Sequence, residues 1–415
     1  MPELALAEPR TLCTDCGVSR SSQPNRCADA CQFIKPDYAV AEQRVHGRPR
    51  KTSDSDELYF GPYQRLHTAS LSAPLQGAQW SGITTRIAER LLETQRVDAV
   101  LAVAPDSRDR WRPRPVIVTQ ASGMAQCRGM RMGYAPVIAL IEPALKAGHR
   151  KLAVIGIPCQ VYALRALETE LIESGQLDEL FVIGTPCSDN TTTENFHLFL
   201  EAITDTPESV SYLEFRTDFH VEVRFDDAPT REIPFLKLPL SDLPADFFPI
   251  TCRTCVDYTN VLCDITVGYM GGDGKQWLIV RNDKGQGMLD LLNNEVELTD
   301  PISRGKRQGS VKGFMANTVR AAGGMPLRKM PNFLRPIVGW LMPRIGPRGL
   351  EFARARVEMK AIECILHLRR SYPKKMQNMI PAFVWEQVSH YSLRPSATEL
   401  NRSNRSGIEH SEESQ

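Results

Sequence analysis

Cysteine content constrains this chain more than any other feature of its 415 residues, because eleven cysteines are present and eight fall into two sets. The first set lies in the string CTDCGVSRSSQPNRCADAC and comprises Cys13, Cys16, Cys27 and Cys31. Four thiolates this close in sequence suit one four-iron four-sulfur cluster or one tetrahedral zinc ion. We therefore predict that residues 1–60 form a small N-terminal iron–sulfur lobe, with a structural zinc knuckle as the alternative.

The second set is dispersed along the chain. Cys159 in GIPCQ and Cys187 in GTPCSDN each follow a predicted strand and a proline, and each precedes a predicted helix. Adjacent parallel strands bring two such turns together, and amides at a helix start favour a thiolate. The pair in TCRTC, Cys252 and Cys255, completes four potential ligands of a second cluster. The alternative is that Cys159 and Cys187 are buried cysteines that only cap strands.

Three cysteines lie outside both sets, and inert packing is the expected role of a buried free cysteine. They are Cys127, Cys263 and Cys364. Whether Cys263, which follows the TCRTC pair, approaches a cluster is left open.

Hydrophobic patterning predicts an α/β fold after the cysteine-rich start. Strands are expected at 98–103, 151–157, 180–183, 265–269 and 277–280, with helices at 82–93, 142–147, 160–170, 192–202, 285–292 and 350–370. This alternation favours a mainly parallel sheet with flanking helices. Alternating polar and apolar residues at 210–215, 220–225 and 231–235 predict an antiparallel β insertion at about 209–237.

The predicted domain boundaries follow from these patterns. Residues 61–300 form the α/β core with the second cluster, residues 301–392 form a C-terminal helical segment, and residues 393–415 form a polar, disordered tail.

Charge and hydropathy restrict the partners. The formal net charge is +1, so no global field draws the chain to nucleic acid. The first residues lack the apolar region of a secretory signal, and no apolar run reaches the roughly 18 residues of a membrane span. A cytoplasmic protein with reduced thiols is predicted, while peripheral membrane association stays open.

Two segments have the composition of a nucleotide or flavin contact. QWSGITT opens a helix with Ser81, Gly82, Thr84 and Thr85, and helix-start amides suit a phosphate or a flavin edge. These residues are equally ordinary helix caps. The glycines of DITVGYMGG, after TCRTC, would let backbone approach a ring closely, although a glycine turn between strands explains them as well.

Together, these strings resemble the β-subunit family of deazaflavin-reducing hydrogenases and dehydrogenases, over most of the chain from Cys13 to about Tyr391. The strings are WSGITT, GIPCQVYALRALE, GTPCSDN, CRTCVDYTN, DITVGYMG and RKMPNFLRPIVGWLMPRIGPRGLEFARARVEMKAIE. The last string and DYTN resemble a photosynthetic branch, which holds 7-hydroxymethyl chlorophyll a reductase and ferredoxin-dependent divinyl chlorophyllide 8-vinyl reductase.

The resemblance implies FAD, two four-iron four-sulfur clusters and reduced ferredoxin as the electron donor. The predicted flavin contacts are Ser81, Gly82, Thr84, Thr85, Asn190, Thr259, Asn260, Asp264, Gly268 and Gly271. Relatives carry a third cysteine three residues after the first C-x-x-C pair, where this chain has Ser19. Cys27 is the obvious substitute ligand, and the departure favours a bacterial 8-vinyl reductase over the plant hydroxymethyl enzyme.

The predicted function is therefore reduction of the 8-vinyl group of divinyl (proto)chlorophyllide in (bacterio)chlorophyll biosynthesis, a CH–CH oxidoreduction with ferredoxin as donor. Electrons would pass from the first cluster to the second and then to FAD. Asp257, Tyr258 and Asp189 are candidate proton donors or positioning groups. The alternatives are a hydroxymethyl chlorophyll reductase, another ferredoxin-dependent reductase, and a non-catalytic electron-transfer subunit of a hydrogenase-like complex.

Ferredoxins are typically acidic, so docking requires a local basic face. Two stretches are candidates: the arginines at 108, 110, 112 and 114, and the basic residues Arg304, Lys306, Arg307 and Lys312.

Overall fold

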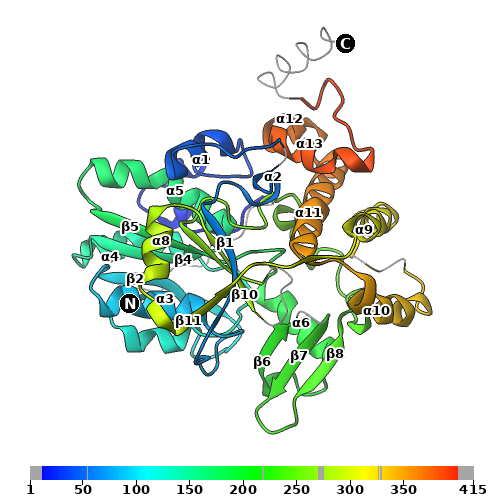
Figure 1. The fold of residues 1–415 in the computed structure, drawn as a ribbon, viewed down its shortest axis with the longest axis horizontal. Helices are drawn as coiled ribbons and strands as arrows, with labels where there is room; N and C mark the ends of the chain where they lie inside the picture. Colours follow the sequence, from blue (N-terminus) through cyan, green and yellow to red (C-terminus); the bar gives the residue numbers. More distant parts are fainter. Residues whose placement is uncertain are drawn as a thin grey trace.

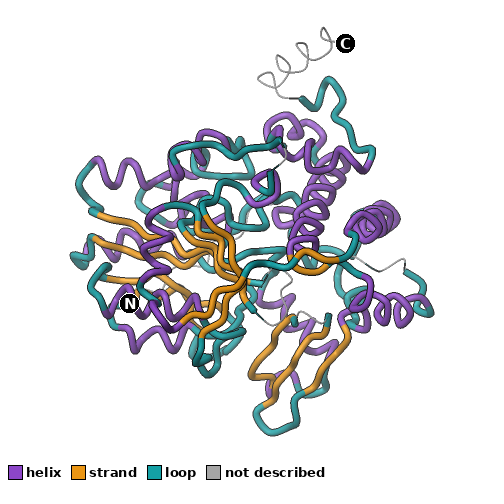
Figure 2. Tube along the Cα trace, viewed as in Figure 1, coloured by secondary structure: helices purple, strands orange, loops and turns teal. Residues whose placement is uncertain are grey.

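A computed structural model describes residues 12–400 of the chain, with the exception of 54, 217–218, 270–274, 326 and 328–329. An eight-stranded sheet in the order β11-β1-β10-β9-β5-β4-β2-β3 runs through the molecule (Figures 1 and 2). Its strands are β1 (Arg65–Leu71), β2 (Ala99–Pro105), β3 (Pro113–Val118), β4 (Lys151–Gly156), β5 (Glu179–Gly184), β9 (Ile265–Gly268), β10 (Gln276–Val280) and β11 (Val296–Thr299).

The four central strands, β2, β4, β5 and β9, pair in parallel. The outer strands pair antiparallel: β3 on β2 at one side, and β10, β1 and β11 beyond β9 at the other. The predicted α/β class with a parallel core and flanking helices is confirmed, whereas the antiparallel outer strands were not predicted.

Helices cover both faces of the sheet because its central strands are apolar on both sides. In β4, the side chains of Leu152 and Val154 join one core and that of Ala153 joins the other. α3 (Ile83–Glu93) and α8 (Asp283–Asp290) contribute to the core with Ala153. The opposite core receives α1 (Tyr38–His46), α4 (Ile141–Lys146), α5 (Pro158–Glu173) and α11 (Leu350–Ser371).

The cysteine-rich start of the chain packs on this main body. It contains two short 3₁₀ helices, η1 (Val18–Arg20) and η2 (Pro24–Cys27), followed by α1 and by α2 (Glu57–Phe60). Val18, Phe33 and Tyr38 belong to the same buried cluster as residues of α5 and α11. The segment therefore shares the core of the main body and has no separate core of its own among the described residues.

The predicted antiparallel insertion is present. β6 (Val210–Phe215), β7 (His220–Phe225) and β8 (Arg231–Pro234) form a separate three-stranded sheet, at the bottom of Figure 1. α6 (Thr193–Ile203) packs against it through Phe196 and Phe199.

The C-terminal part is helical, as predicted. After the short strands β12 (Ser303–Arg304) and β13 (Arg348–Gly349), its elements are α9 (Arg307–Ala321), α10 (Leu334–Ile345), α11, α12 (Met376–Met379) and α13 (Ala382–Val388). Most of the predicted disordered tail, residues 401–415, lies outside the described residues. Among the helices that the structure describes, none combines the length and apolar character that a bilayer crossing requires.

Candidate functional site

Four cysteines from three separate parts of the chain converge on one cavity. β4 and β5 are parallel neighbours, so the segments that follow them meet at the same edge of the sheet. Cys159 lies in the first turn of α5 and Cys187 in the loop after β5. Cys252 lies in the short helix α7 (Ile250–Arg253), and Cys255 follows it. All four line the cavity, so the structure brings together the four cysteines that the sequence grouped as a second set.

Two of these thiols each accept a hydrogen bond from a neighbouring donor. The amide of Asn190 donates to Cys252 Sγ over 3.3 Å, and Gln32 Nε2 donates to Cys255 Sγ over 3.6 Å. Burial raises the pKa of the Cys252 thiol to about 12 and that of Cys255 to about 11. Donors directed at sulfur favour the charged thiolate, which is the form that binds metal.

A buried cation lies beside the same thiols. Lys360, on α11, is 4% exposed. Its Nζ donates to Asp189 over 2.7 Å and to Glu363 over 3.3 Å. The ammonium group lowers the pKa of both Cys252 and Cys255, against the larger effect of burial. The sequence alone does not single out Lys360, because a lysine in a helical repeat has the pattern of a surface residue.

The first cysteine set also gathers in the structure. The charges of Cys27, Cys31 and Cys13 add to burial in raising the pKa of the Cys16 thiol to about 12, so the four thiols lie within electrostatic reach of one another. Among the described residues, no three or more cysteine, histidine, aspartate or glutamate side chains lie close enough together to bind a single metal ion.

The backbone of this loop is held against the main body by hydrogen bonds, and in one of them the Ser22 amide donates to Glu142 Oε1 over 2.8 Å. The amide of Ile138 donates to the Cys16 carbonyl over 3.1 Å. Gly17 follows with a φ of 116°, and a Cβ there would lie 2.4 Å from the amide nitrogen of Ala139. Only glycine fits this contact without strain. Ser19, where relatives carry a cysteine, is exposed on η1.

The two cysteine sets adjoin. Thr14 and Phe33, from the cysteine-rich start, line the cavity of the second set. The Thr14 hydroxyl hydrogen-bonds to the Cys159 thiol, and the charge of Cys16 also acts on Cys159. Tyr134 interacts electrostatically with cysteines of both sets, which together with burial raise its pKa well above the ordinary value. The first cysteine segment therefore forms one wall of the second site.

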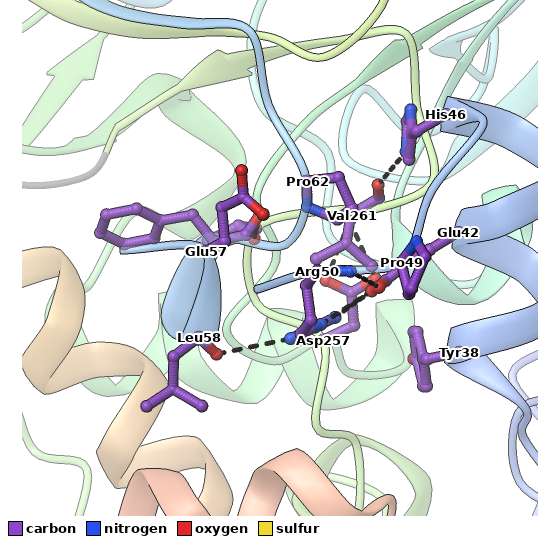
Figure 3. Close-up of polar contacts among 12 residues, drawn as sticks. Tyr38, Glu42, His46, Pro49, Arg50, Glu57, Leu58, Pro62, Asp257 and Val261 are labelled. Carbon is purple, nitrogen blue, oxygen red and sulfur yellow. Dashed lines mark hydrogen bonds and ion pairs between the residues drawn. The ribbon is translucent and has the colours of Figure 1, made fainter. Parts of the chain in front are cut away.

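A polar network joins residues 42–50, which follow the first cysteine set, to the loop after Cys255 (Figure 3). His46 Nε2 lies 2.8 Å from the Val261 carbonyl, and the Asp257 carboxylate accepts from the Val261 amide at 3.2 and 3.1 Å. Arg50 forms a buried ion pair with Glu42 beside them. Burial raises the pKa of Asp257 to about 6, against the effect of nearby arginines. Asp257 thus holds the loop in shape.

Only one of the three candidate proton donors lies at the cavity, and it is Asp189. Tyr258 is buried, and its hydroxyl donates to the Tyr269 carbonyl over 3.2 Å. The positions of Tyr258 and Asp257 indicate structural roles.

Several predicted flavin contacts are bonded within the protein. Thr259, Asn260 and Asp264 are at most 1% exposed. Asp264 forms an ion pair with Arg165 over 2.6 Å, and Asn260 donates to the Gly156 carbonyl over 2.8 Å. The Thr259 hydroxyl donates to a backbone carbonyl over 3.3 Å. The geometry therefore assigns these side chains to the fold and does not support them as flavin contacts.

The remaining flavin candidates divide further. A Cβ at Gly268 would lie 2.3 Å from Pro186, so this glycine serves close packing, and Gly271 lies outside the described residues. The Ser81 hydroxyl accepts from the Leu71 amide over 3.0 Å.

Two of the predicted flavin contacts, Asn190 and Thr84, are only partly buried. Asn190 lines the cavity, and Thr84 is half-buried in the first turn of α3. This helix begins after Gly82, and the Ile83 amide in its first turn donates to Gln276 Oε1 over 3.2 Å. Thr85 in the same turn is buried.

Both basic stretches predicted to dock ferredoxin are partly neutralised. Arg110 pairs with Asp226 over 2.8 Å and Arg112 with Glu194 over 2.9 Å. Arg307 is bound by Glu351 and Glu358 and so anchors α9 to α11. The prediction that Arg307 belongs to a docking face is therefore wrong, because its guanidinium is committed to the fold.

Two family descriptions match the chain. Residues 66–142 match the N-terminal part, and residues 149–303 the C-terminal part, of the coenzyme F420 hydrogenase/dehydrogenase β subunit.

Individual relatives extend over more of the chain. It is 36% identical over 397 residues to 7-hydroxymethyl chlorophyll a reductase, chloroplastic, of Oryza sativa subsp. japonica, covering 91% of this chain and 82% of the relative. It is 34% identical over 385 residues to an uncharacterized protein of Nostoc sp., covering 92% of this chain and 94% of the relative.

The fold is similar to that of a solved chain in the F420-reducing [NiFe] hydrogenase complex from Methanosarcina barkeri. The TM-score is 0.51 at 23% sequence identity, over 58% of this chain and 84% of the other. At this identity the likeness concerns the fold alone.

Proposed function

The chain belongs to the coenzyme F420 hydrogenase/dehydrogenase β-subunit family, and from this premise we propose that it is a ferredoxin-dependent reductase of the 8-vinyl group of divinyl (proto)chlorophyllide. One observation carries the redox part of the proposal: the second cysteine set lines one cavity, and Thr14 and Phe33 from the segment that carries the first set form part of its wall. This arrangement would give single electrons a short path from the first set to the second.

The donor sets fit two iron–sulfur clusters. Each set offers four thiols, which is the ligand number of a four-iron four-sulfur cluster. Lys360 offsets the negative charge of the second set, and the Asn190 amide directs a donor at Cys252. When bound, the two clusters and FAD would together convert single electrons from ferredoxin into a two-electron reduction.

For the flavin, the start of α3 offers the best-supported contact. The Ile83 amide of its first turn donates to Gln276 Oε1 over 3.2 Å, and the next two amides in the turn belong to Thr84 and Thr85. A helix start of this kind suits the phosphate groups of FAD. Asp189 is the proton-donor candidate that its position supports, because it lines the cavity while Lys360 fixes its carboxylate.

A second candidate function is reduction of the 7-hydroxymethyl group of chlorophyll a. The 36% identity to the rice enzyme, over 82% of that protein, favours it. In our proposal, Ser19 favours the 8-vinyl reductase over the hydroxymethyl reductase. Relatives carry a cysteine at this position, whereas here Ser19 is exposed and Cys27 is the fourth cysteine of the first set.

The test is an anaerobic assay of the full-length purified chain after iron, sulfide and flavin analysis. Reduced ferredoxin is supplied with divinyl chlorophyllide or with 7-hydroxymethyl chlorophyll a, and the products are identified by mass. We expect two clusters, one FAD and conversion of the vinyl group to ethyl. Conversion of the hydroxymethyl substrate alone would establish the second candidate. Ferredoxin oxidation without turnover of either substrate would indicate an electron-transfer subunit instead.

A further inference from the structure

The segment from residue 301 to 350 differs in charge from the rest of the chain. It contains ten of the 50 lysine and arginine residues and no aspartate or glutamate. The remainder, with 40 basic residues against all 49 acidic ones, is net negative. Among the described basic residues of this segment, only Arg307 forms an ion pair with a carboxylate. The charges of the other described cations are not neutralised by a carboxylate.

Helix α10 carries a row of exposed apolar side chains within this basic segment. Phe333 is 70% exposed, Ile337 52% and Trp340 58%. Their spacing of four and three residues places them on one helical face. Ile345, at the end of the helix, is 67% exposed. Isolated exposed apolar residues are ordinary, but a row of large ones on one face marks an interaction surface.

The opposite side of α10 attaches it to the protein. Arg335 donates to the Ser241 hydroxyl over 3.0 Å and to the Leu327 carbonyl over 3.1 Å. Gly339 faces Leu236, which a Cβ there would approach to 3.9 Å. The helix is thereby fixed at the edge of the molecule, on the right of Figure 1. Its apolar row is exposed.

A cation accompanies the apolar row. Arg344 lies one turn after Trp340, with its guanidinium 4.2 Å from the centre of the indole ring. Tryptophan and arginine in this combination suit the boundary between acyl chains and headgroups, where the ring stays at the interface and the guanidinium reaches phosphate. A basic amphipathic helix with Trp and Phe on its apolar face is the pattern of an interfacial membrane anchor.

We propose that α10 binds the surface of an anionic phospholipid bilayer, with Phe333, Ile337 and Trp340 inserted among the lipids and Arg344 paired with phosphate. The exposed row stands out from the edge of the protein, so it suits insertion into fluid lipid better than docking on a preformed protein groove. Charge complementarity selects an anionic surface. This inference is independent of the proposed function.

Vesicle flotation with the full-length protein tests the proposal. The probes are vesicles of pure phosphatidylcholine and vesicles that also contain phosphatidylglycerol, at low and high salt. We expect flotation with the anionic vesicles and little with the neutral ones. The double substitution Ile337→Ser with Trp340→Ser should lower partitioning by about tenfold or more, because it removes inserted apolar area. Val40→Ser is the matched control, because Val40 is 59% exposed on α1.

Charge reversal provides a second variant that does not depend on the first. Arg344→Glu should weaken binding to anionic vesicles by about tenfold at low salt, and less at high salt. Lys146→Glu should change it little, because Lys146 is exposed at the end of α4 and lies far from α10 in the sequence. Circular dichroism and thermal unfolding establish that the variants are folded.

Four results would overturn the proposal. The parent protein could fail to float with anionic vesicles, or it could float equally well with the α10 variants and the controls. Light scattering could show a dimer that becomes a monomer in the α10 variants, which would assign the surface to a second copy. A vesicle-free assay in which the α10 variants raise the KM for ferredoxin, without vesicle binding by the parent, would assign it to an acidic protein.

Discussion

The two cysteine sets differ in what holds each of them together. The first set lies in one short loop, so its geometry depends on neighbouring residues and on a few contacts such as that of Gly17 with η4 (Val137–Leu140). The second set is assembled from the segments that follow β4 and β5 and from α7 with the residues just after it, so it depends on the parallel pairing of β4 and β5. A local site can form wherever its loop folds, whereas a dispersed site exists only in the completed fold.

Their surroundings differ in the same way. The second set has Lys360 and Asn190 supplied by distant elements, and the first set forms part of the wall around it. We therefore expect substitutions at the second set and its surroundings to affect both redox transfer and stability, and substitutions at the first set to act locally.

The largest expected effect is on electron transfer from the first cysteine set through the second to the flavin. Cys159→Ser should lower the rate of flavin reduction by ferredoxin by more than about 100-fold, because loss of a ligand disrupts the second cluster. The first cluster should stay reducible, as measured by electron paramagnetic resonance under anaerobic conditions. Cys263→Ser is the control, since Cys263 is buried away from the cavity. Flavin reduction at the parental rate in the Cys159 variant would contradict a relay through this site.

The next prediction isolates the first set. Cys27→Ala should remove about half of the bound iron, one of two clusters, while the protein stays folded. Ser19→Ala should leave the iron content unchanged because Ser19 is exposed. Iron and sulfide analysis of both variants decides the matter, and full iron in the Cys27 variant would show that another ligand completes the set.

A third prediction concerns stability at the second set. Lys360→Met should destabilise the protein by about 3–5 kcal/mol, because it leaves the buried carboxylates of Asp189 and Glu363 without their cation. The exposed Lys312 provides the control Lys312→Met. Denaturant unfolding followed by fluorescence gives both free energies. Equal stability of the two variants would mean that the carboxylates are accommodated without Lys360.

The smallest expected effect concerns His46, whose contact with the Val261 carbonyl joins α1 to the loop after Cys255. Burial lowers the pKa of His46 from 6.5 to about 3 in the folded protein. The unfolded chain therefore binds this proton first as the pH falls. The stabilising contribution is complete above about pH 6.5 and declines as the pH falls towards 3. His46→Gln should make the loss of stability over this window shallower, as measured by unfolding at several pH values. An unchanged pH profile would show that His46 stays accessible to protons.

Parts of the architecture were predictable because their signals are local. The alternating residues of β6 and β7 predict strands whose observed bounds agree, and the C-x-x-C spacings predict cysteine sets that gather in the structure. The outer strands β1 and β11 escaped prediction because their pairing is with strands far away in sequence.

Site residues outside the cysteine sets were less predictable for a physical reason. Asp264 begins a glycine-containing string that suits a cofactor and Asn260 precedes it, yet inside the fold Asp264 pairs with Arg165 and Asn260 Nδ2 donates to the Gly156 carbonyl. Lys360 and Arg307 have the pattern of surface cations, and only tertiary packing shows the carboxylates that bind them.

The wall that the first cysteine segment makes around the second site has a consequence for maturation. The segment is synthesised first, but its packing partners on α5 and α11 are synthesised later, so it can settle only near the end of folding. Once it has settled, Thr14, Gln32 and Phe33 form part of the wall around the second set. If the proposed clusters are bound, delivery of iron and sulfide to that set would be easiest while the segment is still undocked, and the order of loading would follow from the fold.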